Sequence, residues 1–393
     1  MKILLFVPFS LTDQNSAWLL FKKILSHTTE HEITILSLSH KIKPQKKYET
    51  YDLIHYTLLS NQPIIRKIVN KVWKKGHYYI ALYSSKYYAK QISKIIEKKS
   101  IQKIWIFNDM LTVLTISELL KDTTIPYHVS IFDDMLHNKY YKIYGERLEN
   151  EFIKTLKNST SIDVIVPEQK DFYIENNIIK PSHSVAVSYA GIFKKSISEK
   201  YVVQKKVKKI CVTGSVFGLE SFATFCSAVE EICTNEKIEI HIYTNYDKLT
   251  KLNIEKILYK YLHFVSLKQF VPEKEIINTI LKYDIAYIQA PFNSEDKHKA
   301  ITSFPSKTHN YLSSTVPILL HSPDYAAISK FLKGNNLCYS INTINEDEIK
   351  TAFIRFLNYN VRCSIRKNIM EFNDMPNNNL HFENISKIIA SIK

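Results

Sequence analysis

The chain has 393 residues, 45% of them hydrophobic and 23% charged, so it is long enough for two globular domains of about 190 residues each. It contains no run of about 20 uncharged apolar residues, so we predict no transmembrane helix. The five cysteines form no CxxC pair and no metal-ligand spacing, which favours the reducing cytoplasm over a disulfide framework. The apolar start, MKILLFVPFSL, lacks a small-residue cleavage site, and we interpret it as a buried first strand.

The formal net charge is +15, and most of it comes from one segment. Residues Lys41 to Lys103 include 15 lysines and arginines but only three acids, and aromatic side chains lie among the lysines. This mixture suits the headgroup region of an anionic membrane. A solvated basic surface explains the same composition, so both interpretations stay open, whereas we do not expect nucleic-acid binding.

The first half alternates predicted strands and helices. In chain order we expect strands over 2–9, 31–39, 103–108, 126–132, 162–167 and 183–192, with helices over 16–25, 111–120 and 146–157. Strands separated by helices predict a parallel, doubly wound sheet whose ligands lie at the carboxyl ends of the strands. We assign residues 1–193 to this domain and 194–207, which are basic and glycine-free, to a linker.

The second half repeats the pattern over residues 208–376. Expected strands cover 208–213, 238–244, 262–271, 284–290 and 316–320, and expected helices cover 219–233, 273–281 and 346–357, with a short helix starting at Pro305. In the tail, 377–393, isoleucines at helical spacing predict an amphipathic helix. The predicted fold is therefore α/β, with two Rossmann-like domains facing a cleft.

The most informative motif is TSFPSKTHNYLSSTVPILL, residues 302–320. Ser303 can cap a helix and Pro305 suits its first turn. The backbone amides of such a helix start bind anions, and Ser306 and Lys307 lie beside them. A buried strand then follows, so the motif predicts a phosphate site at the edge of a parallel sheet.

The order of motifs resembles the GT-B glycosyltransferases, in particular the family 4-like enzymes of bacterial surface-polysaccharide synthesis. FPSKTHNYLSSTVPIL is similar to the family's donor-binding helix, PSK-x-x-E-Y-L-x-x-G-x-P-V, and ICVTGSVFGLESFATFCSAVEEI to its strand, Gly-Ser loop and helix. FVPEKEIINTILKYDIAYIQAPFN resembles the segment leading to the donor loop, and TSIDVIVPEQKDFYIENNIIKPSHSVAVSYAGIF the end of the first domain.

The resemblance implies a carboxyl-terminal helix that crosses back to the first domain, and a donor site in the second domain. Gly214 and Ser215 would lie against the donor diphosphate, where glycine allows close approach of the backbone. Ser306 and Lys307, with Pro305 preceding them, would hold it from the other side, and the lysine cation would stabilise the leaving group.

Two positions depart from the family's pattern. Asn310 stands where a glutamate hydrogen-bonds the ribose. Glu295 lies near the family's first acidic residue, which has a catalytic role, but the partner position eight residues on is Ser303. The two-glutamate signature is therefore incomplete.

Acceptor-side candidates follow predicted strands of the first domain. The resemblance places Asp133 at the edge that faces the acceptor, where a carboxylate with a raised pKa can act as general base. His128 and Asp134 are neighbouring candidates, and Asp13 and Asn15 follow the first strand. A helix cap explains Asp133 equally well and is the preferred explanation for Asp13, and Asp133–Asp134 lacks the spacing of a metal-binding DxD site.

The resemblance implies an enzyme without metal or cofactor, a hexosyltransferase that moves a sugar from a nucleotide-sugar donor to a glycan or lipid-linked glycan in surface polysaccharide synthesis. We expect it in the cytoplasm, peripheral at the inner face of the plasma membrane through the Lys41–Lys103 region. The departures at Asn310 and Ser303 favour an alternative, a non-catalytic nucleotide-binding or scaffold protein. A nucleotide-sugar epimerase of the same fold is a second alternative.

Overall fold

The computed structural model describes residues 1–8, 11, 16–26, 31–39, 52–57, 75–132, 134–136, 145–189, 201–216, 218–244 and 254–375, together with 385, 387 and 389. The chain forms two compact units. The first comprises Met1–Gly191 with Leu380–Lys393, so the carboxyl-terminal segment returns to the amino-terminal unit, as the sequence predicts. The second comprises Ile192–Asn379.

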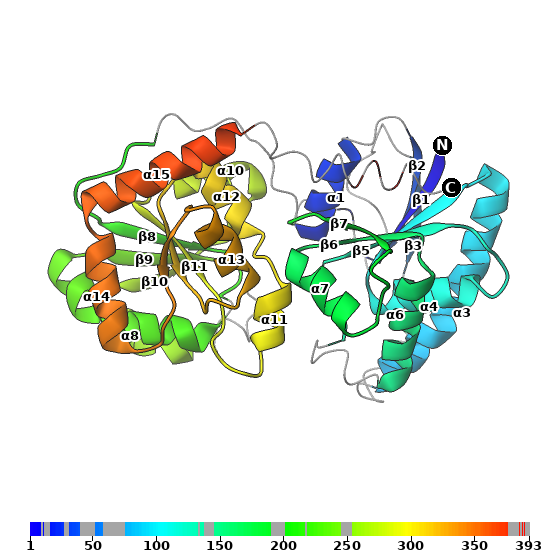
Figure 1. The fold of residues 1–393 in the computed structure, drawn as a ribbon, viewed down its shortest axis with the longest axis horizontal. Coiled ribbons are helices and arrows are strands. Elements are labelled where there is room, and N and C mark those ends of the chain that lie inside the picture. The colour runs from blue at the N-terminus through cyan, green and yellow to red at the C-terminus, as the bar shows by residue number, and fades with distance from the viewer. Residues whose placement is uncertain are drawn as a thin grey trace. The chain divides into compact units, whose positions relative to one another are not determined.

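The first unit contains a seven-stranded parallel sheet with helices on both faces (Figure 1). The strand order is β3-β2-β1-β4-β5-β6-β7. The strands are β1 (Lys2–Val7), β2 (Glu32–Ser39), β3 (Asp52–Thr57), β4 (Lys103–Phe107), β5 (Tyr127–Ile131), β6 (Ser161–Val164) and β7 (Ser184–Val187). The helices are α1 (Ser16–Ser26), α3 (Lys75–Lys99), α4 (Met110–Leu119), α6 (Glu146–Asn158) and α7 (Pro167–Glu175).

Apolar strand residues form the core of this unit. Leu4, Phe6, Ile106 and Val129 are fully or almost fully buried, as expected for a parallel sheet covered on both faces. Helix α4 begins immediately after β4 because Asp109 accepts a hydrogen bond from the Leu111 amide at 3.0 Å. All of α3 lies in the basic Lys41–Lys103 segment, for which no helix was predicted.

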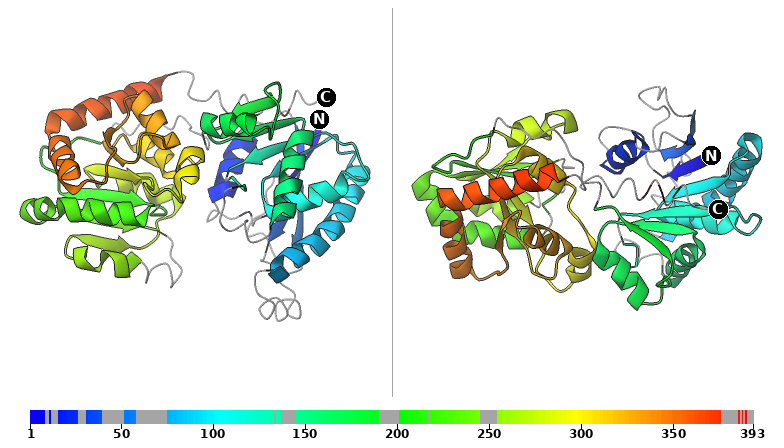
Figure 2. Two further views of the ribbon diagram at one scale, coloured as in Figure 1. Left: turned by 60° about the horizontal axis from the view of Figure 1, so that its bottom comes forward. Right: turned by 45° about the horizontal axis from the view of Figure 1, so that its top comes forward.

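The second unit contains a six-stranded parallel sheet in the order β10-β9-β8-β11-β12-β13, also covered on both faces (Figure 2). Its strands are β8 (Lys209–Thr213), β9 (Glu239–Tyr243), β10 (Val265–Lys268), β11 (Ile285–Gln289), β12 (Ile318–His321) and β13 (Tyr339–Ile341). Its helices are α8 (Leu219–Glu236), η2 (Tyr259–Tyr261), α10 (Glu273–Ile280), α11 (Lys297–Thr302), α12 (Lys307–Ser314), α13 (Ala327–Gly334), α14 (Glu346–Phe356) and α15 (Tyr359–Asp374).

Aromatic side chains join the layers of the second unit. Tyr287 of β11 packs against Phe225 of α8, with ring centroids 4.6 Å apart. Phe225 in turn meets Phe353 of α14 at 5.6 Å. Tyr311 of α12 reaches the strands through its hydroxyl group, which bonds to Thr213 at the end of β8. These contacts fix α8 and α12 relative to β8 and β11.

The segment that leads into β8 is anchored by a buried arginine. The Arg362 guanidinium of α15 donates to the carbonyl oxygens of Gln204 at 2.8 Å and Lys205 at 3.0 Å. The Asp284 carboxylate accepts from the Lys208 and Lys209 amides at 2.7 and 2.9 Å. Part of the predicted linker, residues 201–207, is thus bonded into the second unit.

In the ranges given above, no helix is both long enough and apolar enough to cross a membrane.

Candidate functional site

Three chain segments meet at the carboxyl edge of the second sheet. One is the loop after β8 that contains Gly214 and Ser215, and another is the loop after β11 that starts at Ala290. The third is the start of α12, which runs back along the sheet into β12. This edge is where open parallel α/β sheets bind ligands.

Lys307 joins two of these segments. It is the first residue of α12 and is only 8% exposed. Its Nζ donates a hydrogen bond to the carbonyl oxygen of Ser215 at 3.1 Å. The residues predicted to hold a diphosphate from two sides are therefore in direct contact.

Burial lowers the pKa of Lys307 from 10.5 to about 8, because an ammonium ion is poorly solvated there. The resulting site combines a desolvated cation with three exposed residues, Gly214, Ser215 and Ser306. A phosphate group that entered it would restore favourable electrostatics around the ammonium group and raise its pKa again.

Tyr311 holds the same two segments together one turn further along α12. Its hydroxyl oxygen accepts from the Thr213 amide at 2.8 Å and from Thr213 Oγ1 at 3.1 Å. Tyr311 is not among the site residues predicted from the sequence. Its place beside Lys307 could have been predicted, because the two residues are four apart and therefore lie on the same face of the helix.

Two glycines shape the loop after β8. Gly214 has φ +69°, a left-handed conformation that disfavours side chains, and its amide donates to the Tyr243 carbonyl at 2.8 Å. Gly218, with φ +81°, is packed so tightly that a Cβ would lie 3.0 Å from backbone atoms of Pro291. Gly218 thus brings the loop after β8 against the loop after β11, a contact that the sequence analysis missed.

The predicted cap of the donor helix is wrong. Ser303 is the residue that ends α11, with extended backbone angles, and Ser306 is the N-cap of α12. The chain makes a separate turn between the two helices, in which the Thr308 amide bonds to the Pro305 carbonyl at 3.0 Å. Pro305 therefore lies just before the cap, and the helix starts from Ser306.

Two further donor-site candidates lie close to these segments in the fold. Asn310 is half-buried on α12, four residues after Ser306 and therefore on the same helix face. Glu295 is exposed in the loop between β11 and α11. The following residue, Asp296, is held in that loop because its backbone amide donates a hydrogen bond to Asn293 Oδ1 at 2.8 Å.

In the first unit, His128 of β5 lies in the core. It is fully buried, and its Nε2 is 2.8 Å from Asp163 Oδ1 while its Nδ1 is 2.8 Å from Ser161 Oγ. Trp105 and Ser130 extend this network, since the indole nitrogen donates to Ser130 Oγ at 2.8 Å. Both ring nitrogens of His128 are therefore occupied by protein partners and face no solvent.

Asp134 is also buried, at 8% exposure. Its Oδ1 accepts from the Tyr173 hydroxyl at 2.9 Å, which ties the end of β5 to α7. Burial, and secondarily the charge of Asp134, raises the pKa of Tyr173. The other acceptor-side candidates, Asp13, Asn15 and Asp133, lie outside the described residues.

Within the part of the chain that the structure describes, no group of three or more His, Cys, Asp or Glu side chains is placed to hold a metal ion.

Comparison with known proteins gives matches only at the level of structure. No protein-family model matches the sequence, and no curated protein sequence matches it. A trehalose-6-phosphate structure from E. coli bound with UDP-2-fluoro glucose is 12% identical, with a TM-score of 0.71 over 100% of both chains. A glycosyltransferase from Rickettsia africae is 14% identical, with a TM-score of 0.60 over 100% of this chain and 99% of that one. The lipopolysaccharide outer core galactosyltransferase WaaB is 12% identical, with a TM-score of 0.58 over the same shares.

These similarities cover the whole chain at low sequence identity. They establish that the protein has the GT-B fold of two Rossmann-like units, as the sequence predicts.

Proposed function

We propose that the protein is a glycosyltransferase that binds a nucleotide-sugar donor at the carboxyl edge of the second sheet. The observation that carries the proposal is the hydrogen bond between the buried Lys307 ammonium group and the Ser215 carbonyl. It joins a helix start and a glycine loop around one desolvated cation, which is a suitable site for a diphosphate. The structural neighbour bound with UDP-2-fluoro glucose supports the same class of ligand.

In this proposal, Lys307 acts on the leaving group. When the bond between sugar and diphosphate breaks, negative charge develops on the diphosphate oxygens. A fixed ammonium group beside them stabilises that charge more in the transition state than in the bound donor. Ser306 and the Lys307 amide bind the diphosphate from one side, and Gly214 and Ser215 from the other, while the Thr308 and His309 amides are bonded within the turn. The positive charge comes from Lys307 rather than from a metal ion.

The remaining donor contacts come from the same edge of the sheet. Asn310 hydrogen-bonds a ribose hydroxyl with its amide oxygen, while Pro305 fixes the backbone entering the turn. Glu295 lies on the loop after β11 and contacts the transferred sugar. Because Asn310 is uncharged, we expect weaker ribose binding than a glutamate would give.

On the acceptor side, we propose Asp133 as the general base, with Asp13 and Asn15 binding acceptor hydroxyl groups. Asp134 supports this edge indirectly through its hydrogen bond to Tyr173. We leave His128 out of the proposed site, because its buried ring is engaged by Asp163 and Ser161.

We further propose that the acceptor is a lipid-linked glycan of surface polysaccharide synthesis and that α3 contacts the membrane that carries it. Support comes from the exposed face of this helix. The Tyr83 side chain is 75% exposed and that of Tyr87 43%, and both rings lie among exposed lysines at positions 86, 90 and 94. Tyrosine and lysine on one helix face are typical of segments that lie at an anionic membrane surface.

A donor-hydrolysis assay across UDP-, GDP-, CMP- and dTDP-sugars tests the central claim. We expect slow hydrolysis of one donor and its loss in Lys307→Met, which retains the length of the side chain without its charge. Thermal stabilisation by a nucleoside diphosphate without hydrolysis or transfer would indicate a non-catalytic binding protein instead. Absence of both would overturn the proposed donor site.

A further inference from the structure

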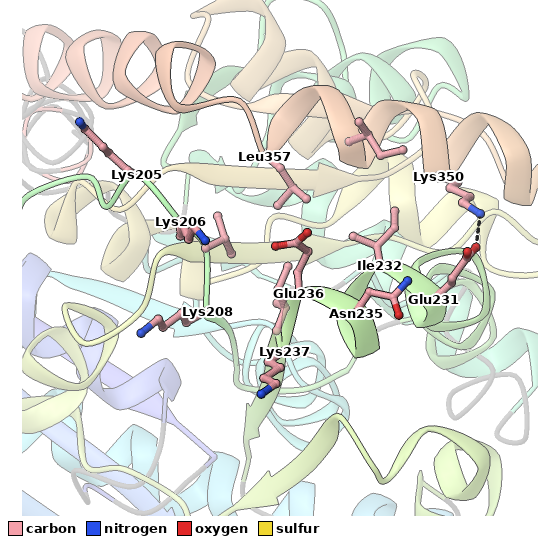
Figure 3. Close-up of a pocket in the computed structure, with 13 residues that line it drawn as sticks. Lys205, Lys206, Lys208, Glu231, Ile232, Asn235, Glu236, Lys237, Lys350 and Leu357 are labelled. Carbon is pink, nitrogen blue, oxygen red and sulfur yellow. Dashed lines mark hydrogen bonds and ion pairs between the residues drawn. The ribbon is translucent and has the colours of Figure 1, made fainter.

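A second pocket lies at the opposite, amino edge of the sheet in the second unit (Figure 3). Its volume is about 850 Å³, within the range of small-molecule sites. Three segments form it: residues 205–208 before β8, the end of α8 with the start of β9, and the last turns of α14. It therefore does not share residues with the Lys307 site.

The charges around this pocket are unevenly distributed. On one side, the Lys350 ammonium group pairs with Glu231 at 2.5 Å, and Lys350 lowers the pKa of that carboxyl. Lys206, Lys208 and Lys237 lie on the other side with the Glu236 carboxylate beside them, as Figure 3 shows, whereas Lys205 lines the pocket further out and points away from these three. Within the described residues, none of these four lysines forms an ion pair.

The floor of the pocket is apolar. Val207 and Ile238 are buried there, and Ile232 and Leu357 are half-buried. Ile354 is 53% exposed at the rim. A pocket with an apolar floor and cations along one side fits a ligand that has an anionic head and an apolar body.

We infer that this pocket binds a phosphate ester carried on an apolar body. The lysines contact the phosphate oxygens by charge-assisted hydrogen bonds, and the body lies on the floor against Ile232 and Leu357. The inference is independent of the proposed transferase activity. It also differs from a purely structural role for the lysines, which is to complement the negative carbonyl ends of α8 and α14.

Calorimetry with hexyl phosphate tests the inference. The full-length chain is used with Lys307→Met in all samples, so that the Lys307 site does not take up the phosphate. The pocket variant combines Lys206→Gln, Lys208→Gln and Lys237→Gln. The control combines Lys256→Gln, Lys260→Gln and Lys282→Gln, three exposed lysines of the same unit, so the change in net charge is equal.

We expect hexyl phosphate to bind the parent and the control alike, and the pocket variant about tenfold or more weakly. Inorganic phosphate should bind more weakly than hexyl phosphate, because it leaves the floor uncovered. Flotation with vesicles of phosphatidic acid then distinguishes the source of the ester, provided that every sample also carries Tyr83→Ser, Lys86→Gln, Lys90→Gln and Lys94→Gln, so that α3 does not hold the chain on the vesicle. Loss in the pocket variant but not the control indicates a lipid headgroup, and equal flotation indicates a soluble ligand.

Two results would overturn the inference. One is the absence of hexyl phosphate binding to the parent, and the other is equal weakening in the pocket variant and the control. If either result came with a lower melting temperature for the pocket variant alone, the lysines would have the structural role at the helix ends.

Discussion

The Thr213 amide donates a 2.8 Å hydrogen bond to the hydroxyl oxygen of Tyr311. Both residues are buried, and the bond joins the last residue of β8 to the middle of α12. One helical turn earlier, Lys307 meets the Ser215 carbonyl two residues beyond Thr213. Two contacts therefore set the position of the Lys307 ammonium group over the glycine loop: the buried Thr213–Tyr311 hydrogen bond and the bond from Lys307 itself to Ser215.

Removing the Tyr311 hydroxyl should weaken both stability and donor binding. In Tyr311→Phe the Thr213 amide keeps no partner in a buried position, which costs about 1–3 kcal/mol. We expect a lower melting temperature and a higher KM for the donor. Tyr127→Phe is the matched control in the first unit, where the hydroxyl donates to the Thr155 carbonyl at 2.7 Å. An unchanged donor KM in Tyr311→Phe would argue against its role in positioning Lys307.

Replacing Lys307 should stabilise the protein while removing donor binding. Its pKa falls from 10.5 to about 8 on folding, so the unfolded chain holds the proton more tightly, which costs about 3 kcal/mol at neutral pH. The full cost applies below pH 8 and disappears as the pH rises toward 10.5. Denaturant unfolding of Lys307→Met at pH 7 should therefore show a gain in stability, and Lys282→Met, at an exposed position, no change. A loss of stability in Lys307→Met would contradict this account.

Nucleotide affinity should fall as the pH rises above 8. Below that pH, Lys307 is charged in both the free and the bound protein, so affinity is constant. Above it, the free lysine is neutral and must take up a proton when a diphosphate binds, which weakens binding by up to about tenfold per pH unit. Calorimetry in buffers of different ionisation enthalpy would detect the proton. Lys307→Arg should abolish the pH dependence, because arginine stays charged.

The exposed face of α3 should bind anionic vesicles. We expect flotation with phosphatidylglycerol vesicles that weakens with salt. It should be lost when Lys86, Lys90 and Lys94 are changed to glutamine and Tyr83 to serine. The control changes the three lysines at 256, 260 and 282. Equal flotation of both variants would show that general charge, rather than this helix face, accounts for binding.

The fold could be predicted from the sequence because strands that are buried on both faces appear as continuous apolar runs. Runs such as KILLFV and IAYIQ carry that signal by themselves. Helix α15 was missed because asparagine and charged residues interrupt its apolar spacing, and its first-turn cap, Asn358, was not recognised. Helix α11, with only six residues, is too short for a periodic pattern.

At the site, contacts between segments far apart in the chain could be predicted only where the resemblance to a known family supplied them. Gly214, Ser215 and Lys307 could be paired because the order of motifs resembles a known family. The burial of His128 could not be predicted, since its partners Ser161 and Asp163 come from a neighbouring strand and depend on the register of β5 and β6. The same limit applies to Gly218, whose tight contact with Pro291 joins two loops about 70 residues apart.

Arg362 has a practical consequence for dividing the protein. Its guanidinium group is bonded to the Gln204 and Lys205 carbonyls, and the Tyr201 hydroxyl donates to the Asp284 carbonyl at 3.2 Å. A fragment of the second unit that began at the first strand residue, Lys209, would leave this buried cation without those acceptors. Isolated second units should therefore begin upstream of Tyr201, with the basic segment retained as part of the folded unit rather than trimmed as a tether.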